Sequence, residues 1–134
     1  MCCHATTRST KRFLASLKPG TKYVRGWKVV TRTGASWYQH YHFRPGVHFV
    51  DVDIEKYPYP CEGFHFYLVR PVREPPSFVV EVRVHPQDIF LADYVPSEPG
   101  PFDMPEAVAT RIQIETRDWK RAGLPKPKPQ KVIK

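Results

Sequence analysis

Acidic residues are absent from the first 50 positions of this sequence, although the 134-residue chain contains 13 Asp and Glu in total. Residues 1–50 carry nine Lys and Arg, residues 51–118 carry all 13 acids against six cations, and residues 119–134 add six more cations. The three segments therefore have net charges of +9, −7 and +6, which give the formal net charge of +8. Charge blocks of this kind predict an electrostatically polarised molecule with basic surfaces.

Long apolar runs are also absent. No stretch approaches the roughly 20 apolar residues that cross a bilayer, and residues 1–17 lack the pattern of a secretory signal. The three cysteines are an odd number, and Cys2 and Cys3 are neighbours, so no disulfide framework is expected. We therefore predict a soluble cytoplasmic protein that makes no membrane contact.

The length of the chain predicts a single domain. We expect a flexible N-terminus over residues 1–8, one globular domain over 9–119 and a disordered Pro/Lys-rich tail over 120–134, which favours polyproline II. From Tyr23 onward, short β-branched and aromatic runs alternate with Gly and Pro, a texture typical of strands and turns. These runs predict strands at residues 27–32, 37–43, 47–52, 63–69, 78–84 and 111–116.

Helical signals are few and short. Ser9 or Thr10 can cap a short helix that ends before Pro19. Single helical turns are expected over residues 86–91 and 103–110. The fold class is therefore mainly β (α+β), a compact antiparallel sheet or small barrel or sandwich with one or two short helices.

The densest group of aromatic and basic residues is Trp37-Tyr-Gln-His-Tyr-His-Phe-Arg44. Bases stack on aromatic rings while Lys and Arg neutralise phosphates, so such a strand is typical of single-stranded nucleic-acid binders. We predict a non-enzymatic basic binding module whose partner is RNA or DNA. The expected contact residues are Lys11, Arg12, Lys22, Arg25, Lys28, Arg32, Trp37, Tyr38, His40, His42 and Arg44.

Other interpretations of the same residues stay open. Trp37, Tyr41 and Phe43 would share one face of a strand and can simply be core. The basic arms can also dock on an acidic protein partner, as an inhibitor or a virion component would. Whether Trp37 faces the core or the solvent separates these interpretations.

Metal and enzyme hypotheses rest on scattered residues. His40 and His42 could form half of a zinc site, with Cys61 and His65 as the other half, but no Cys-x-x-Cys motif accompanies them. The same histidines could act as acid and base in a phosphoester reaction. We assign no catalytic residue, no metal ligand and no cofactor.

The sequence departs from the residue patterns of two known enzyme classes. Two-histidine phosphoesterases need His-x-Ser/Thr twice, whereas Val50 and Tyr67 stand two residues after His48 and His65. Glu81 and Glu115, with Arg25 and Ser36, are loosely similar to the Arg, Ser and Glu of small ADP-ribosyltransferases. The spacing of these four residues is unconstrained, and they can equally be ordinary solvent-exposed strand residues.

Four segments carry a resemblance to a known family: Gly26-Trp-Lys-Val-Val30, Cys61-Glu-Gly-Phe-His-Phe66, Val79-Val-Glu-Val-Arg-Val84 and Ala107-Val-Ala-Thr-Arg-Ile-Gln-Ile114. Their order over residues 24–116 resembles a family of uncharacterised small domains from bacteriophage and bacterial genomes. The resemblance implies a phage accessory protein that acts in the host cytoplasm or is packed in a virion. It implies no activity and no catalytic residues.

Overall fold

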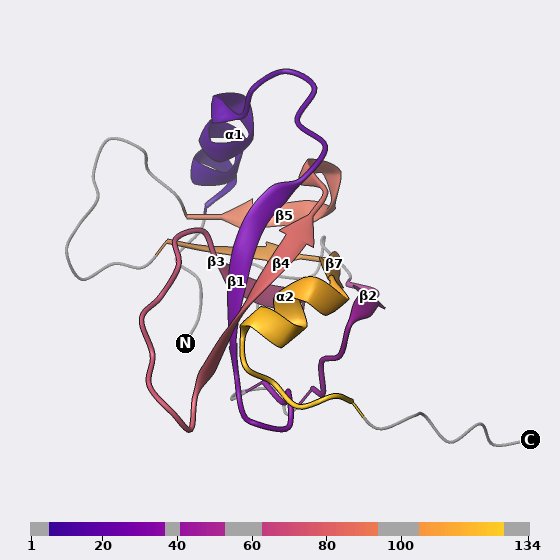
Figure 1. The fold of residues 1–134 in the computed structure, drawn as a ribbon. Helices are drawn as coiled ribbons and strands as arrows, with labels where there is room; N and C mark the ends of the chain where they lie inside the picture. Colours follow the sequence, from indigo (N-terminus) through magenta and orange to yellow (C-terminus); the bar gives the residue numbers. More distant parts are fainter. Residues whose placement is uncertain (1–5, 37–40, 53–62, 94–104, 128–134) are drawn as a thin grey trace, which may run out of the picture.

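The structure, a computed structural model, describes residues 6–36, 41–52, 63–93 and 105–127 (Figure 1). Within these ranges seven strands form one sheet, and every strand pair is antiparallel. The strands are β1 (Val24–Val30), β2 (Gly46–Phe49), β3 (Phe64–Tyr67), β4 (Phe78–Val84), β5 (Ile89–Ala92), β6 (Glu106–Ala109) and β7 (Arg111–Ile114). The predicted mainly β class is confirmed.

The sheet cannot be flat, because its strand order is β2-β7-β4-β1-β3-β6-β5 and a single residue, Thr110, joins β6 to β7. In a flat sheet these two strands, four places apart, would be separated by about 19 Å. The Cα atoms on either side of Thr110 can be at most about 7 Å apart. The sheet therefore bends back on itself, and Figure 1 shows β5 crossing the direction of β1 and β4.

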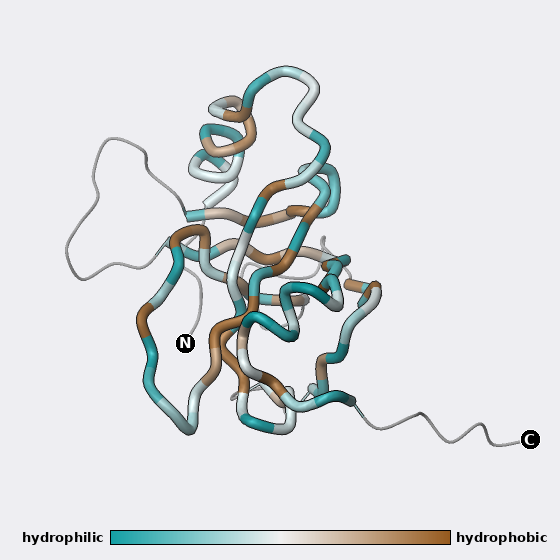
Figure 2. Tube along the Cα trace, viewed as in Figure 1, coloured by the Kyte–Doolittle hydropathy of each residue, from teal (hydrophilic) through white to brown (hydrophobic). Residues whose placement is uncertain are grey.

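The concave side of this sheet holds the core. Val80, Val82 and Val84 of β4 are buried while Glu81 and Arg83 are partly exposed, which confirms the predicted alternation. Figure 2 shows the same change between hydrophobic and hydrophilic residues along β1 and β4. Phe64 and Phe66 of β3 and Ile112 and Ile114 of β7 complete the interior, which Trp119 closes at one end. The opposite face of the sheet is consequently the outer face.

Two short α-helices flank the sheet in the described ranges. Helix α1 (Thr7–Ser16) packs against β5, and helix α2 (Thr116–Arg121) packs against β4 (Figure 1). The cap of α1 is Thr6, in a capping box with Ser9, so the predicted cap at Ser9 or Thr10 is wrong. Helix α2 was not predicted, and the buried Leu124 extends the packed part of the chain beyond residue 119.

Several predicted elements differ from the structure. The turn expected over residues 86–91 is a short 3-10 helix η2 (Pro86–Asp88) that continues directly into β5. Within the turn expected over 103–110, the described residues form β6, whose four residues are all buried. Residues 37–40 of the strand expected at 37–43 lie outside the described residues, and His42 makes a single bridge to Ala35. In the described residues, no helix is both long and apolar enough to cross a membrane.

Candidate nucleic-acid interface

Strand pairing defines which side chains share the outer face. Residues that pair directly across neighbouring antiparallel strands point to the same face. Val47 pairs with Gln113, Gln113 with Arg83, and Arg83 with Arg25, so these residues form one row across β2, β7, β4 and β1. Phe49 pairs with Arg111 in a neighbouring row. The outer face therefore combines Arg side chains with apolar and aromatic ones.

Arginine lies beside aromatic rings on each of these strands. The guanidinium carbon of Arg25 is 5.8 Å from the centre of the Trp27 ring, that of Arg83 is 6.0 Å from Tyr23, and that of Arg111 is 5.5 Å from Phe49. Arg73 makes a similar contact with Tyr67 at 6.0 Å. Phe49 is 60% exposed and Val47 62%, on the edge strand of the sheet. Phe49 is thus accessible to a planar ligand, as is the exposed Tyr23, whereas Trp27 and Tyr67 are partly buried.

Acidic residues partly balance this charge. Glu81 binds Arg25, and Glu115 binds Arg83 at 2.8 Å, both in exposed or half-exposed pairs of low energetic value. The hydrogen bond and charge of Glu81 raise the pKa of Arg25. Among the described residues no carboxylate lies within ion-pair distance of Arg111. Of Arg25, Arg83 and Arg111, Arg111 is therefore the least neutralised.

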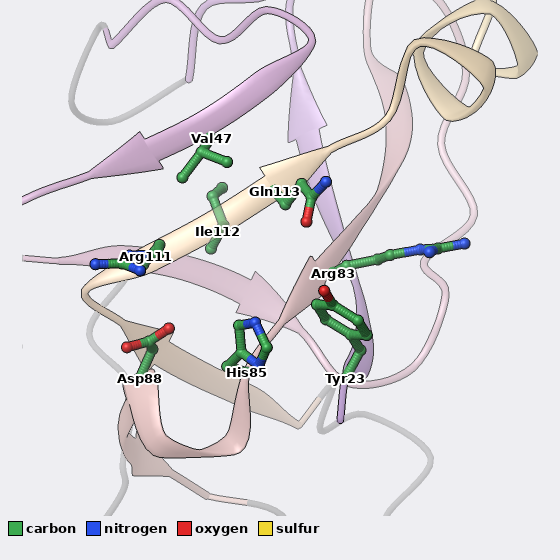
Figure 3. Close-up of a pocket in the computed structure, with 8 residues that line it drawn as sticks. All are labelled: Tyr23, Val47, Arg83, His85, Asp88, Arg111, Ile112 and Gln113. Atoms are coloured by element: carbon green, nitrogen blue, oxygen red, sulfur yellow. The ribbon is translucent and has the colours of Figure 1, made fainter. Parts of the chain in front are cut away.

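A shallow depression of about 110 Å³ opens at one end of this face (Figure 3). It is lined by Tyr23, Val47, Arg83, His85, Asp88, Arg111, Ile112 and Gln113. The His85 and Tyr23 rings pack at 4.5 Å between centroids, with 39° between their planes. The depression therefore combines a cationic rim, an aromatic wall and one carboxylate.

The cations predicted from the sequence do not gather at one place. Lys11 and Arg12 lie on α1, while Lys22 and Arg32 stand at opposite ends of β1, all four exposed. Arg25 lies on the outer face, Arg44 is partly buried before β2, and His42 is exposed. Trp37, Tyr38 and His40 lie outside the described residues. In the structure, Arg25 therefore lies in a row with Arg83 and Gln113 and not beside the other predicted contact residues.

The prediction for Lys28 is wrong, because its side chain is on the inner face. Lys28 lies on the same face of β1 as the buried Val24, Gly26 and Val30, and only 8% of its area is exposed. Its ammonium donates a hydrogen bond to the carbonyl oxygen of His65 and lies 5.1 Å from the centre of the Phe43 ring. A phosphate on the surface cannot reach this ammonium.

The described part of the predicted aromatic cluster is mainly structural. Phe43 is buried and packs with Tyr41, His48 and Phe64. His48 Nε2 lies 2.7 Å from the carbonyl oxygen of Arg44, which can only accept, so Nε2 donates and Nδ1 faces the Tyr41 hydroxyl at 2.9 Å. Phe43 is therefore a core residue. The hydrogen bond between His48 and the Arg44 carbonyl oxygen holds the turn that leads into β2.

The enzyme and metal hypotheses gain no cluster from the described ranges. No group of three or more His, Cys, Asp or Glu there is arranged to hold a metal ion, and Cys61 and His40 lie outside those ranges. Ser36 is buried and its hydroxyl accepts a hydrogen bond from the Tyr41 amide. Arg25 and Glu81 bind each other, and Glu115 binds Arg83 and Arg117.

Sequence reasoning missed most of the outer face. Arg83 and Arg111 were not predicted as contact residues because they fall in residues 51–118, the segment of net charge −7. The alternation of the strands could have located both residues. Arg83 lies on the face opposite the apolar residues of 78–84, and Arg111 lies on the face opposite Ile112 and Ile114. No family model, curated protein or solved structure matches this chain.

Proposed function

We propose that this protein is a non-enzymatic module that binds single-stranded RNA or DNA on the outer face of its sheet. The observation that carries the proposal is the set of Arg–aromatic pairs formed by Arg25, Arg83 and Arg111 with Trp27, Tyr23 and Phe49. Bases stack on such rings whatever their sequence, and the guanidinium groups neutralise the adjacent phosphates. The resemblance to bacteriophage and bacterial domains extends this proposal to a phage accessory protein.

The aromatic surface of the sheet supports a single strand over a duplex. The aromatic rings lie on a sheet, and bases must be unstacked to contact them. The exposed cations of α1, which are Arg8, Lys11 and Arg12, do not extend this face, because α1 packs against β5 at the edge of the sheet opposite β2.

The test is fluorescence anisotropy with labelled nine-nucleotide RNA and DNA, single- and double-stranded, after nuclease treatment of the protein. The double variant Phe49→Ala/Arg111→Ala removes one stacking ring and one phosphate contact, and we expect at least about tenfold weaker binding. Arg12→Ala is the matched control, because it removes one exposed cation from α1, which packs at the other edge of the sheet. Equal losses for both variants, or no binding at low salt, would contradict the proposal.

A protein partner is the second candidate function, and one observation favours it. Val47 and Phe49 expose apolar surface on β2, which pairs with no described strand other than β7. An extended acidic peptide could add to such an edge. Binding of nuclease-treated protein to an acidic partner, with none to nucleic acid, would favour this function.

A further inference from the structure

The depression at the end of the outer face is built by the bend of the sheet. The Thr110 amide, between β6 and β7, donates a hydrogen bond to the Asp88 carbonyl oxygen at 3.0 Å. Its own carbonyl oxygen accepts one from the Val50 amide at 2.9 Å. These bonds hold η2 and the end of β2 against the start of β7. Asp88 is therefore fixed beside Arg111 by the backbone and not by an ion pair.

One atom of this site lacks a partner. The Asp88 Oδ2 atom is buried and accepts no hydrogen bond from any described residue. A carboxylate is an acceptor without donors, and an unsatisfied buried acceptor is unfavourable. Asp88 as a whole is half-buried and lines the depression, so its carboxylate group lies at the wall of the opening. A ligand that offers N–H donors there would satisfy it.

The other walls restrict that ligand further. Figure 3 shows His85 between Asp88 and Tyr23, with Arg111 on one side of the depression and Arg83 on the other. Tyr23 is 41% exposed, while its ring packs on His85 with 39° between the planes and lies 6.0 Å from the guanidinium carbon of Arg83. A planar group can contact the exposed part of this ring. The Arg111 and Arg83 side chains flank the depression and extend outward from it, so their positive charges favour a negative group outside the depression and disfavour a cationic side chain.

We infer that the depression is a guanine subsite, which binds the base of a guanine nucleotide between the Tyr23–His85 wall and the Asp88 carboxylate. This inference rests on the proposed function and names the base that it prefers. The Watson–Crick edge of guanine presents two adjacent donors, N1–H and N2–H, to an acceptor-only group. Adenine, cytosine and uracil each place an acceptor next to their donor, which repels a carboxylate. The phosphate of the same nucleotide reaches Arg111 or Arg83.

The experiment compares labelled nine-nucleotide single strands of uridine with and without one central guanosine, inosine, adenosine or cytidine. We expect the guanosine strand to bind roughly tenfold tighter than the all-uridine strand, since a bidentate contact discriminates by roughly 5- to 150-fold. Inosine keeps N1–H and lacks the N2 amino group, so its strand should bind with intermediate affinity. Asp88→Asn should reduce the guanosine preference to less than about twofold.

Charge and folding need their own controls. Asp88→Asn raises the net charge by one, which strengthens all phosphate binding. Glu74→Gln makes the same change at an exposed site before β4, whereas the depression lies after the end of that strand, and should leave the preference intact. His85→Ala is a second variant that leaves the carboxylate and should weaken the guanosine strand selectively. Circular dichroism verifies that each variant is folded.

The outcomes separate this inference from the function on which it rests. Binding of all strands with equal affinity, or a guanosine preference that survives Asp88→Asn, overturns the guanine subsite and leaves the proposed function standing. No binding of any strand at low salt overturns the proposed function. Competition by guanosine monophosphate but not by uridine monophosphate supports the subsite. Its strength relative to the guanosine strand shows whether a free nucleotide or a strand presents the base.

Discussion

Lys28 places an ammonium group in the core of a small domain. Burial lowers the pKa of this amine from 10.5 to about 8, and the negative charge of Glu106 opposes the shift. Because the unfolded chain retains the ordinary pKa, folding with Lys28 charged costs up to about 3 kcal/mol. The hydrogen bond to the His65 carbonyl oxygen offsets only part of a burial cost of this kind.

Replacing the amine by an apolar group of similar shape should therefore stabilise the fold. We predict that Lys28→Met raises the free energy of unfolding at pH 7 by about 1–3 kcal/mol, measured by urea denaturation. The Met side chain can fill the space beside Phe43 without a buried charge. A fall in stability would show that the bond to His65 and the charge of Glu106 outweigh desolvation.

The same amine predicts a pH dependence. Between pH 8 and 10.5 the unfolded chain holds the Lys28 proton while the folded chain has released it. The unfolded state then binds more protons, so the contribution of Lys28 to stability rises with pH across this window. The stability advantage of Lys28→Met should be largest below pH 8 and shrink toward pH 10.5. A gap that stays constant over this window would contradict the assigned pKa.

At the scale of elements, α1 satisfies the backbone of the edge strand β5. The Ala92 amide donates to the Thr10 hydroxyl at 3.1 Å, and the Ala92 carbonyl oxygen accepts from the Ser9 hydroxyl at 2.7 Å. Side chains of the helix thus take the place that another strand would occupy. This arrangement blunts an edge that could otherwise pair with another chain.

We predict that Thr10→Val lowers the free energy of unfolding by about 1–3 kcal/mol, because it leaves the buried Ala92 amide without an acceptor. Thr7→Val is the control, since it makes the same exchange at an exposed position of the same helix. Both variants are measured by chemical denaturation. Equal effects would mean that helix propensity, and not the bond to β5, determines the loss.

Gly26 permits a close approach between β1 and β3. A Cβ atom at this position would lie 2.3 Å from Cδ2 of the buried Phe66 ring. We predict that Gly26→Ala lowers the free energy of unfolding by about 1–3 kcal/mol through overpacking. The added substitution Phe66→Leu should restore part of the loss in a double-mutant cycle. Additive losses would place the cause elsewhere.

The strands that the sequence predicts well are those with a clear period. Residues 78–84 alternate so regularly that the predicted and observed bounds of β4 coincide. A helical turn was predicted at β6 because Asp103 and Glu106, with Pro105 between them, form a capping pattern, and Glu106-Ala-Val-Ala shows no alternation against it. Its conformation depends on pairing with β3 and β5, which is a tertiary effect. Local signals cannot carry such information.

The candidate site was predictable in kind but not in place. Composition predicts a basic surface with aromatic residues, and Arg25, named as a contact residue, is exposed on β1, although the predicted strand began only at residue 27. The neighbours of Arg25 depend on strand register, which sets Arg83 opposite it and Gln113 beyond. Lys28 was misplaced because its charge predicts exposure, whereas its position in the alternation of β1 predicts burial.

At the scale of the whole molecule, the proposed function assigns affinity to the basic segments and base preference to the depression. The outer face offers three Arg, of which Arg25 and Arg83 are shared with Glu81 and Glu115. Residues 128–134 add three Lys, at positions 128, 131 and 134, with no acid. Lysine ammonium groups that contact phosphates contribute to affinity without reading bases. These lysines should therefore change the affinity for all strands by a similar factor and leave the preference between strands unchanged.

We predict that deleting residues 128–134 weakens binding of all single strands by a similar factor and leaves the guanosine preference unchanged. Each phosphate contact contributes about 0.7 to the slope of log affinity against log salt for single strands, so the slope should fall by up to about 2. Arg111→Ala should lower it by about 0.7, since it removes one contact. Anisotropy titrations at several salt concentrations measure both slopes. An unchanged slope after the deletion would mean that these lysines do not contact the strand and that the folded face supplies the phosphate binding alone.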